Sequence, residues 1–450
     1  MSENEKNKGV EQYLEGNEYN PGDDFEPQIA YKVKKDENGK PIQDFKDRPK
    51  NNQLLTSELL DNPRYETGPL AYNPVGQYIF KSKFSSIGAS LICCVAGIIL
   101  GTVIMLILNP TKFGYGYYIF WSSGFSDLTQ ALYLMGPLVF CGLAVGLCYK
   151  CGMFNIGASG QYAIGGFMAL LCCYKFNLHW SLGLLIGIVA GMVVGAIPGL
   201  LKSYFNVNEV ISAIMVNWIV LYLVRILIKS IPGFFIQTDS GTPKINGLPG
   251  ELPNMYTSAS SYPLTITIIL AIVVALIVAL ILNKTTFGYK LKATGFNRSA
   301  AEYAGVNSKR NIILAFAISG AIAGLGGACF YLSPNNIFKG DITAVWSEGF
   351  DGISVAFLAN NSPIGIIFSG FFVAFLKVCG KGLTNDTGFD SSTADITISI
   401  ILYLSAFALI IYNKLMKDKN KKDYKLDKEI LINNRNQDVT SDTSTNTEAN

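Results

Sequence analysis

The chain has 450 residues, half of them hydrophobic and only 15% charged, and its formal net charge is +3. So small a basic excess argues against a protein that binds nucleic acid. Apolar runs of 18 or more residues indicate helices that cross a membrane, because about 20 residues span a hydrocarbon core of about 30 Å. We therefore expect an all-α integral membrane protein surrounded by lipid.

The N-terminal segment 1–80 is polar and carries 15 acidic and 10 basic residues without a sustained apolar period. This composition predicts a disordered cytoplasmic tail. No basic start precedes an apolar core, so a cleavable signal peptide is not expected. Residues 416–450 are predicted to form a second polar cytoplasmic tail, which leaves 81–415 as the transmembrane domain.

Within this domain we expect a polytopic bundle of about ten transmembrane helices, some of them broken. The clearest spans are the long apolar runs 84–108, 126–148, 180–203, 208–230, 262–283, 311–332 and 396–413. The weaker spans are shorter or interrupted by glycine, at 153–173, 352–360 and 363–380.

The basic residues of the loops predict the orientation, because lysine and arginine favour the cytoplasmic side. They precede the first span, follow the last span, and outnumber the acids in the loop 284–310, where Glu302 is the one acid. An even number of spans satisfies all three placements. We therefore expect a multi-pass protein of the plasma membrane with both termini and the loop 284–310 in the cytoplasm.

No catalytic or metal-binding residues are expected. Cys148 and Cys151 have the spacing of a redox pair or half a zinc site, but no second pair is present and His179, the one histidine, lies elsewhere. Two Gly-Lys pairs are followed by Pro41 and Gly382, where a phosphate loop needs serine or threonine. The chain thus needs no cofactor of its own. If nucleotide powers it, another chain binds the ATP and Mg²⁺.

Small residues predict how two of the spans pack. Glycines recur every four residues along one span and at similar spacing along another, at Gly183, Gly187, Gly191, Gly195 and Gly199, and at Gly320, Gly324 and Gly327. Such stripes let helix backbones approach closely in lipid. A seam along which bundles slide during transport is the functional alternative.

Polar side chains at membrane depth predict a solute path, because lipid leaves them unsatisfied. The candidates fall in three short segments: Asn155, Ser159 and Gln161; Asn208, Glu209, Ser212 and Asn217; and Asp351 and Ser354. Helix capping at the membrane interface is the alternative, since Asn155, Asn208 and Asn361 are all good caps.

The polar segment 290–306 separates two apolar runs and is predicted to hold one small helix. Ser299 and Glu302 have the spacing of a capping box, and Gly305 is placed to end the helix in the left-handed conformation. A capped helix between two spans is a rigid element through which a partner outside the membrane can move the spans.

Four ordered motifs lie in residues 80–413, at 154–161, at 207–215, at 293–306 with 319–328, and at 349–356. Together they resemble the permease subunits of ABC importers for nucleosides and simple sugars, a group that also includes ribose and branched-chain amino-acid permeases. The pattern from Asn208 to Ser212 is closest to the nucleoside branch. The chain departs from the family pattern at Phe296 and in the turn at 359–363, which lacks an arginine.

The resemblance implies a second permease subunit, cytoplasmic ABC ATPase subunits, and an extracytoplasmic binding lipoprotein that delivers a nucleoside. It also implies that the segment 293–306 couples to the ATPase through Asn297, Ser299, Glu302, Tyr303 and Gly305. A permease for ribose, galactose or a similar sugar is the first alternative. An ion-coupled secondary transporter is the second, although no pair of acids is expected deep in a span.

Overall fold

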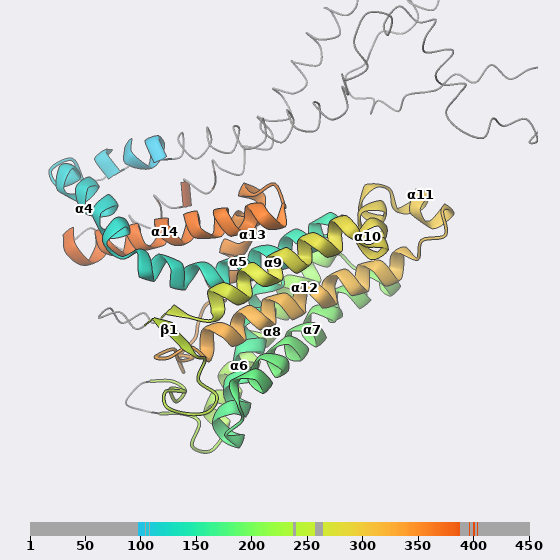
Figure 1. Ribbon diagram of the computed structural model, residues 1–450, viewed down its shortest axis with the longest axis horizontal. Helices are drawn as coiled ribbons and strands as arrows, with labels where there is room; N and C mark the ends of the chain where they lie inside the picture. The colour runs from blue at the N-terminus through green and yellow to red at the C-terminus, as the bar shows by residue number, and fades with distance from the viewer. Residues whose placement is uncertain are drawn as a thin grey trace, which may run out of the picture. The chain divides into compact units, whose positions relative to one another are not determined.

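The computed structural model describes residues 98–387, except 104, 108, 237–239 and 257–263, together with 396, 399, 400 and 403. The predicted tails lie outside the described residues, as do most of the predicted first and last spans. The described part is mostly helical, with one short hairpin and several irregular loops (Figure 1). The expectation of a mostly helical membrane protein is therefore confirmed.

Six described helices are long and apolar enough to cross a membrane. They are α5 (Leu128–Lys150), α7 (Trp180–Phe205), α8 (Glu209–Ser230), α9 (Thr267–Lys284), α12 (Ser308–Tyr331) and α14 (Pro363–Thr387). Each coincides with a predicted span. A shorter apolar stretch, Ile98–Ile107, lies within the first predicted span.

Two of the weaker predicted spans take other forms. The span at 153–173 is α6 (Ala158–Phe176), which begins five residues later than predicted, after a non-helical connection that follows Gly152 at φ 74°. The span at 352–360 is α13 (Ser347–Leu358), a helix of 12 residues. At 1.5 Å per residue it is about 18 Å long, which is too short to cross the bilayer alone. This corrects the expectation of a separate span there.

Shorter elements connect the long helices. α4 (Phe113–Ser126) precedes α5, and strands β1 (Asn254–Tyr256) and β2 (Leu264–Thr265) form an antiparallel pair before α9. At the other end of α9, α10 (Thr286–Phe296) and α11 (Arg298–Tyr303) lead into α12. Figure 1 shows α10 and α11 beside the start of α12, away from the hairpin.

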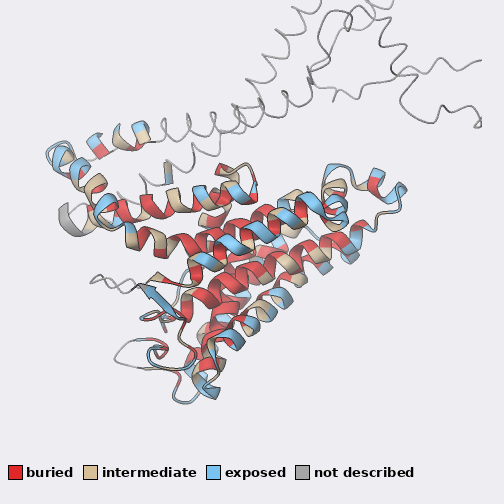
Figure 2. Cartoon of the chain, viewed as in Figure 1, coloured by how far each residue is buried: buried red, intermediate tan, exposed pale blue. Residues whose placement is uncertain are grey.

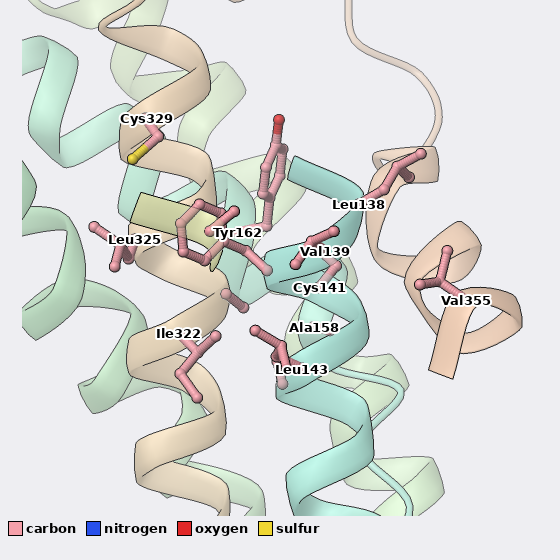
Figure 3. Packing of buried hydrophobic residues seen from close by; sticks show 14 of the residues in the cluster. Leu138, Val139, Cys141, Leu143, Ala158, Tyr162, Ile322, Leu325, Cys329 and Val355 are labelled. Carbon is pink, nitrogen blue, oxygen red and sulfur yellow. The ribbon is translucent and has the colours of Figure 1, made fainter. Parts of the chain in front are cut away.

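The core is centred on α5, with α6 and α12 packed against it. In the most apolar part of α5, 89% of the residues are buried, against 28% in α9, so α9 lies at the edge of the bundle (Figure 2). Figure 3 shows Tyr162 of α6 between Leu325 of α12 and Val139 of α5. Tight packing of this kind holds helices together in lipid, where apolar burial from water is missing.

Glycines line the contact between α7 and α12. A Cβ atom at Gly195 would lie 2.6 Å from the carbonyl oxygen of Phe316, and one at Gly191 would lie 2.7 Å from the Cα of Gly324. The two backbones are therefore in direct contact, and a side chain at either glycine would separate the helices. Gly165 brings α6 against the same part of α12.

Candidate functional site

A closed network of polar side chains lies inside the bundle at the start of α6. Asn155 donates from Nδ2 to Gln161 Oε1 at 2.8 Å and to Ser319 Oγ at 2.7 Å, and Gln161 Nε2 donates back to Asn155 Oδ1 at 3.2 Å. Ser319 Oγ donates in turn to the carbonyl oxygen of Ala144 at 2.7 Å. All three side chains are fully buried. The network joins α5, α6 and α12 through hydrogen bonds that water does not weaken.

Asn217 extends this network to α8. Its Oδ1 accepts from the amide of Gly160 at 2.9 Å, and its Nδ2 donates to the carbonyl oxygen of Ile156 at 3.0 Å. Helix α6 begins after Gly157, which has no side chain to cap the first turn. The cap is therefore supplied by a neighbouring helix. This corrects the alternative in which Asn155 is the cap, since Asn155 Oδ1 accepts only from the Gly157 amide and from Gln161.

The first turn of α13 meets the first turn of α6. Ser159 Oγ donates to the carbonyl oxygen of Trp346, the residue immediately before α13. Gly349 lies so close to the backbone of Ser159 that a Cβ atom there would overlap it. Trp346 is held in turn by Tyr331 of α12, whose hydroxyl oxygen lies 2.9 Å from Trp346 Nε1. Two helix N-termini thus converge inside the bundle.

We call the residues Asn155, Ser159, Gln161, Asn217 and Ser319 the polar cluster. Four of its members were among the residues expected to line a solute path. Ser319 was named only as part of a motif, although a lone serine in an apolar run is a signal in its own right. Trp346 and Tyr331 were missed, because nothing in the sequence indicates that the chain before α13 returns to the centre of the bundle.

The other expected path residues lie elsewhere. At the start of α8, Asn208 caps the helix by accepting from Val210 N at 2.9 Å. Glu209 pairs with Lys202 at 2.8 Å. Ser212 of α8 donates to the Glu209 carbonyl at 3.1 Å. On α13, Asp351 pairs with Lys377 of α14 at 2.5 Å, and Ser354 is half-buried.

The turn between α13 and α14 departs from the predicted capping by Asn361. Asn360 and Asn361 have φ angles of 50° and 53°, and their amides close the end of α13 by donating to Phe357 O and Ala356 O. Among the described residues, Asn361 Oδ1 has no hydrogen-bond partner. Its role is to turn the chain sharply, because asparagine tolerates the left-handed region better than other non-glycine residues.

The cap of α11 differs by two positions from the predicted capping box. Asn297, not Ser299, is the N-cap, and its Oδ1 accepts from Ala300 N at 3.0 Å. Glu302 pairs instead with Arg298 at 3.2 Å. Gly305 is left-handed at φ 79°, and its amide and that of Val306 donate to Glu302 O and Ala301 O. That is the Schellman pattern of a helix C-terminus.

Three aromatic side chains of α10 and α11 are exposed, and two of them are almost completely exposed. Phe296 is 94% exposed and Tyr303 is 95% exposed. The segment is nevertheless fixed to the bundle, since Asn311 of α12 donates to Thr294 Oγ1 at 3.0 Å. A Cβ atom at Gly295 would lie 2.6 Å from the carbonyl oxygen of Lys150, so α10 presses directly on the end of α5.

The cysteine pair lies at that same end of α5. Cys148 and Cys151 are both buried free thiols. Burial raises the pKa of the Cys151 thiol to about 12, which keeps it protonated and unreactive at neutral pH. Among the described residues, no group of three or more His, Cys, Asp or Glu side chains is arranged to hold a metal ion.

Comparison with known proteins identifies the family of this chain. The model described as "Branched-chain amino acid transport system / permease component" matches residues 128–408, well over half of the chain. The chain belongs to this permease family. It is therefore a multi-pass membrane component of a transport system and not an enzyme, and both the polar cluster and the segment α10–α11 lie within the matched region.

Three relatives match this permease over most of their length. The guanosine ABC transporter permease protein NupP of Bacillus subtilis is 32% identical over 75% of this chain and 98% of its own. The nucleoside ABC transporter permease protein NupB of Lactococcus lactis is 33% identical over 75% of this chain and 95% of its own. A glucose ABC transporter permease protein, TsgB13 of Haloferax volcanii, is 28% identical over 70% of this chain and 86% of its own. No solved structure matches the chain.

Proposed function

We propose that the chain is the permease subunit of an ATP-driven ABC importer that carries nucleosides across the plasma membrane. The observation that carries this proposal is the match to two permeases named for guanosine and nucleosides, each covered almost end to end. The similarity spans the polar cluster and the segment α10–α11 together. A glucose permease is less similar over a smaller share, so a simple sugar is the second candidate substrate.

The chemistry of the polar cluster suits a neutral solute. Its hydrogen-bonding groups are amides, hydroxyls and backbone carbonyls, and aromatic rings of Tyr162, Tyr331 and Trp346 lie close by. A nucleoside offers a base that stacks on such rings and a ribose that needs donors and acceptors. In the described conformation the cluster satisfies itself. Transport requires that α6 part from α8, α12 or α13, so that the freed groups bind solute.

The segment α10–α11 is the element through which a cytoplasmic ATPase would drive that motion. Phe296 and Tyr303 offer an aromatic contact at its tip, and interfaces are often anchored by such residues. Pressure on α10 is transmitted through Gly295 to Lys150 and Gly152. From Gly152 the chain runs directly to Asn155. Closure of the ATPase subunits on ATP would therefore loosen or tighten the polar cluster.

The remaining parts of the proposed importer follow from this assignment. A second permease subunit completes the path, and an extracytoplasmic binding lipoprotein delivers the nucleoside. Both termini and the loop 284–310 face the cytoplasm, in agreement with the basic residues of that loop. ATP and Mg²⁺ bind to the ATPase subunits.

Uptake of radiolabelled guanosine by cells that carry or lack this chain tests the proposal. Competition with other nucleosides, but not with ribose, galactose or glucose, is the expected result. If a sugar competes better than nucleosides for uptake, the substrate is a simple sugar instead. Uptake that survives ATP depletion but is lost when the ion gradient collapses would instead indicate an ion-coupled transporter.

A further inference from the structure

A cavity of about 330 Å³ lies between the last turn of α7 and the first turns of α12, at the same end of the bundle as α11. Its wall combines basic, polar and apolar side chains: Tyr204, Asn307, Lys309, Arg310, Ile313 and Leu314. None of these residues belongs to the polar cluster or to α10–α11. The cavity is therefore separate from the site described above.

The positive charge of the cavity is uncompensated. Lys309 and Arg310 are exposed, and within the part of the chain that the structure describes neither forms an ion pair. Two other basic side chains at this end are paired, Lys202 with Glu209 at 2.8 Å and Arg298 with Glu302 at 3.2 Å. Two adjacent unpaired cations attract an anion, and arginine suits phosphate oxygens in particular.

The backbone that carries these two residues is held in place. Ser203 Oγ of α7 donates to the carbonyl oxygen of Lys309 at 3.1 Å, which ties the start of α12 to α7. Asn307 caps α12 by accepting from Arg310 N at 3.0 Å. The two helix ends that carry the wall of the cavity are thus fixed to each other through backbone hydrogen bonds.

Apolar surface continues from the cavity along the membrane-spanning part of α7. Ile197 is 41% exposed, Leu200 is 42% exposed and Tyr204 is 65% exposed. Their spacing of three and four residues places them on one side of the helix. Together with Ile313 and Leu314, they form an apolar strip that begins at the charged mouth of the cavity. A free phosphate ion makes no favourable contact with such an apolar strip, whereas the acyl chain of a lipid does.

We propose that this cavity binds an anionic phospholipid of the surrounding leaflet. The phosphate group contacts Lys309 and Arg310, and an acyl chain lies along Leu200 and Ile197. A basic pocket between transmembrane helices at a membrane interface is the arrangement that recognises anionic headgroups. The inference holds whichever solute the permease carries, and a failure of nucleoside uptake would leave it untouched.

Native mass spectrometry of the assembled transporter in detergent tests the proposal, with dioleoyl-phosphatidylglycerol and dioleoyl-phosphatidylcholine titrated separately. Phosphatidylglycerol should bind more tightly than phosphatidylcholine. In a Lys309→Gln/Arg310→Gln double variant, its affinity should fall roughly 30-fold, about fivefold for each basic side chain. Phosphatidylcholine should lose less affinity, because its choline cation offsets the charge of the phosphate that the two side chains contact. A Lys284→Gln/Lys290→Gln control removes the same charge from exposed positions on α9 and α10 and should retain phosphatidylglycerol affinity within about twofold.

Several outcomes would overturn this assignment. One is an equal loss of phosphatidylglycerol affinity in the two double variants, which would mean that only the net charge of the protein matters. Another is full displacement of phosphatidylglycerol by inorganic phosphate, which would make the cavity a site for a free anion. Loss of the ATPase subunits from the Lys309→Gln/Arg310→Gln complex with lipid affinity intact would make it a protein-docking site.

A second measurement uses the unaltered protein, in case the variant does not assemble. Photoactivatable phosphatidylglycerol with its reactive group near the headgroup should label peptides that contain Tyr204 or residues 307–314. Labelling spread evenly over the lipid-exposed helices would contradict the proposal.

Discussion

Asn217 of α8 caps the first turn of α6 by accepting the amide hydrogen of Gly160 at 2.9 Å. The contact is close enough that a Cβ atom at Gly160 would lie 2.8 Å from Asn217 Oδ1. A helix end is thus completed by a side chain from another helix, and α8 cannot move away from α6 without leaving buried backbone groups unpaired.

Replacement of Asn217 by alanine should therefore destabilise the protein. The change leaves the Gly160 amide and the Ile156 carbonyl unpaired at a position that is 1% exposed, at a cost of roughly 1–3 kcal/mol for each group. The measurement is the thermal unfolding midpoint of the purified protein. Ile219→Ala is the control on the same helix, since Ile219 is 63% exposed and should have little effect. A midpoint for Asn217→Ala equal to that of Ile219→Ala would contradict the capping role.

The glycine contact between α7 and α12 predicts that Gly195→Ala is harmful. Its methyl group would meet the carbonyl oxygen of Phe316 at 2.6 Å, so the two helices must separate, at a cost of about 1–3 kcal/mol. Gly114→Ala is the matched control, because nothing lies within 4 Å of the added methyl group. Urea or thermal unfolding should show a loss for the first variant and no loss for the second. If both variants are equally stable, α7 and α12 can separate without a loss in the free energy of unfolding.

Tyr303→Ala should uncouple transport without unfolding the protein. Tyr303 is 95% exposed, so the free energy of unfolding should change by less than about 0.5 kcal/mol. If the side chain anchors the ATPase, solute-stimulated ATP hydrolysis and uptake should fall about tenfold or more. Tyr289→Ala removes another exposed tyrosine, 72% accessible, from the same segment and should retain uptake. Unimpaired uptake by Tyr303→Ala would remove the coupling role.

Cys148 and Cys151 should resist alkylation in the folded protein. Because burial raises the pKa of the Cys151 thiol to about 12, very little of it is thiolate at pH 8. Peptide mass spectrometry after N-ethylmaleimide treatment should find both thiols unmodified, and both modified after denaturation. Cys172, which is partly exposed, serves as the internal reference. Rapid labelling of Cys151 in folded protein would show that the end of α5 opens to water.

The sequence by itself determined that this is a helical membrane protein, and it located five of the six long spans to within about five residues, whereas the predicted span 363–380 ends seven residues before α14 does. Apolar runs of sufficient length are a local property, since lipid forces each one to satisfy its backbone as a helix. The resemblance carried by short motifs also identified the permease family before any contact was known. The glycine stripes indicated close packing, although not which helices meet.

Only the tertiary structure decided how the polar residues are used. Asn155 and Ser319 are 164 positions apart, so no local pattern reveals that they share a hydrogen bond. Asn297 and Ser299 are both good caps, and local propensity alone did not distinguish them. The position of α13 depends on the meeting of Gly349 with Ser159, which is again a contact between distant segments. The positions of the spans follow from residues that are adjacent in the sequence. The polar cluster follows from contacts between residues that are far apart in the sequence.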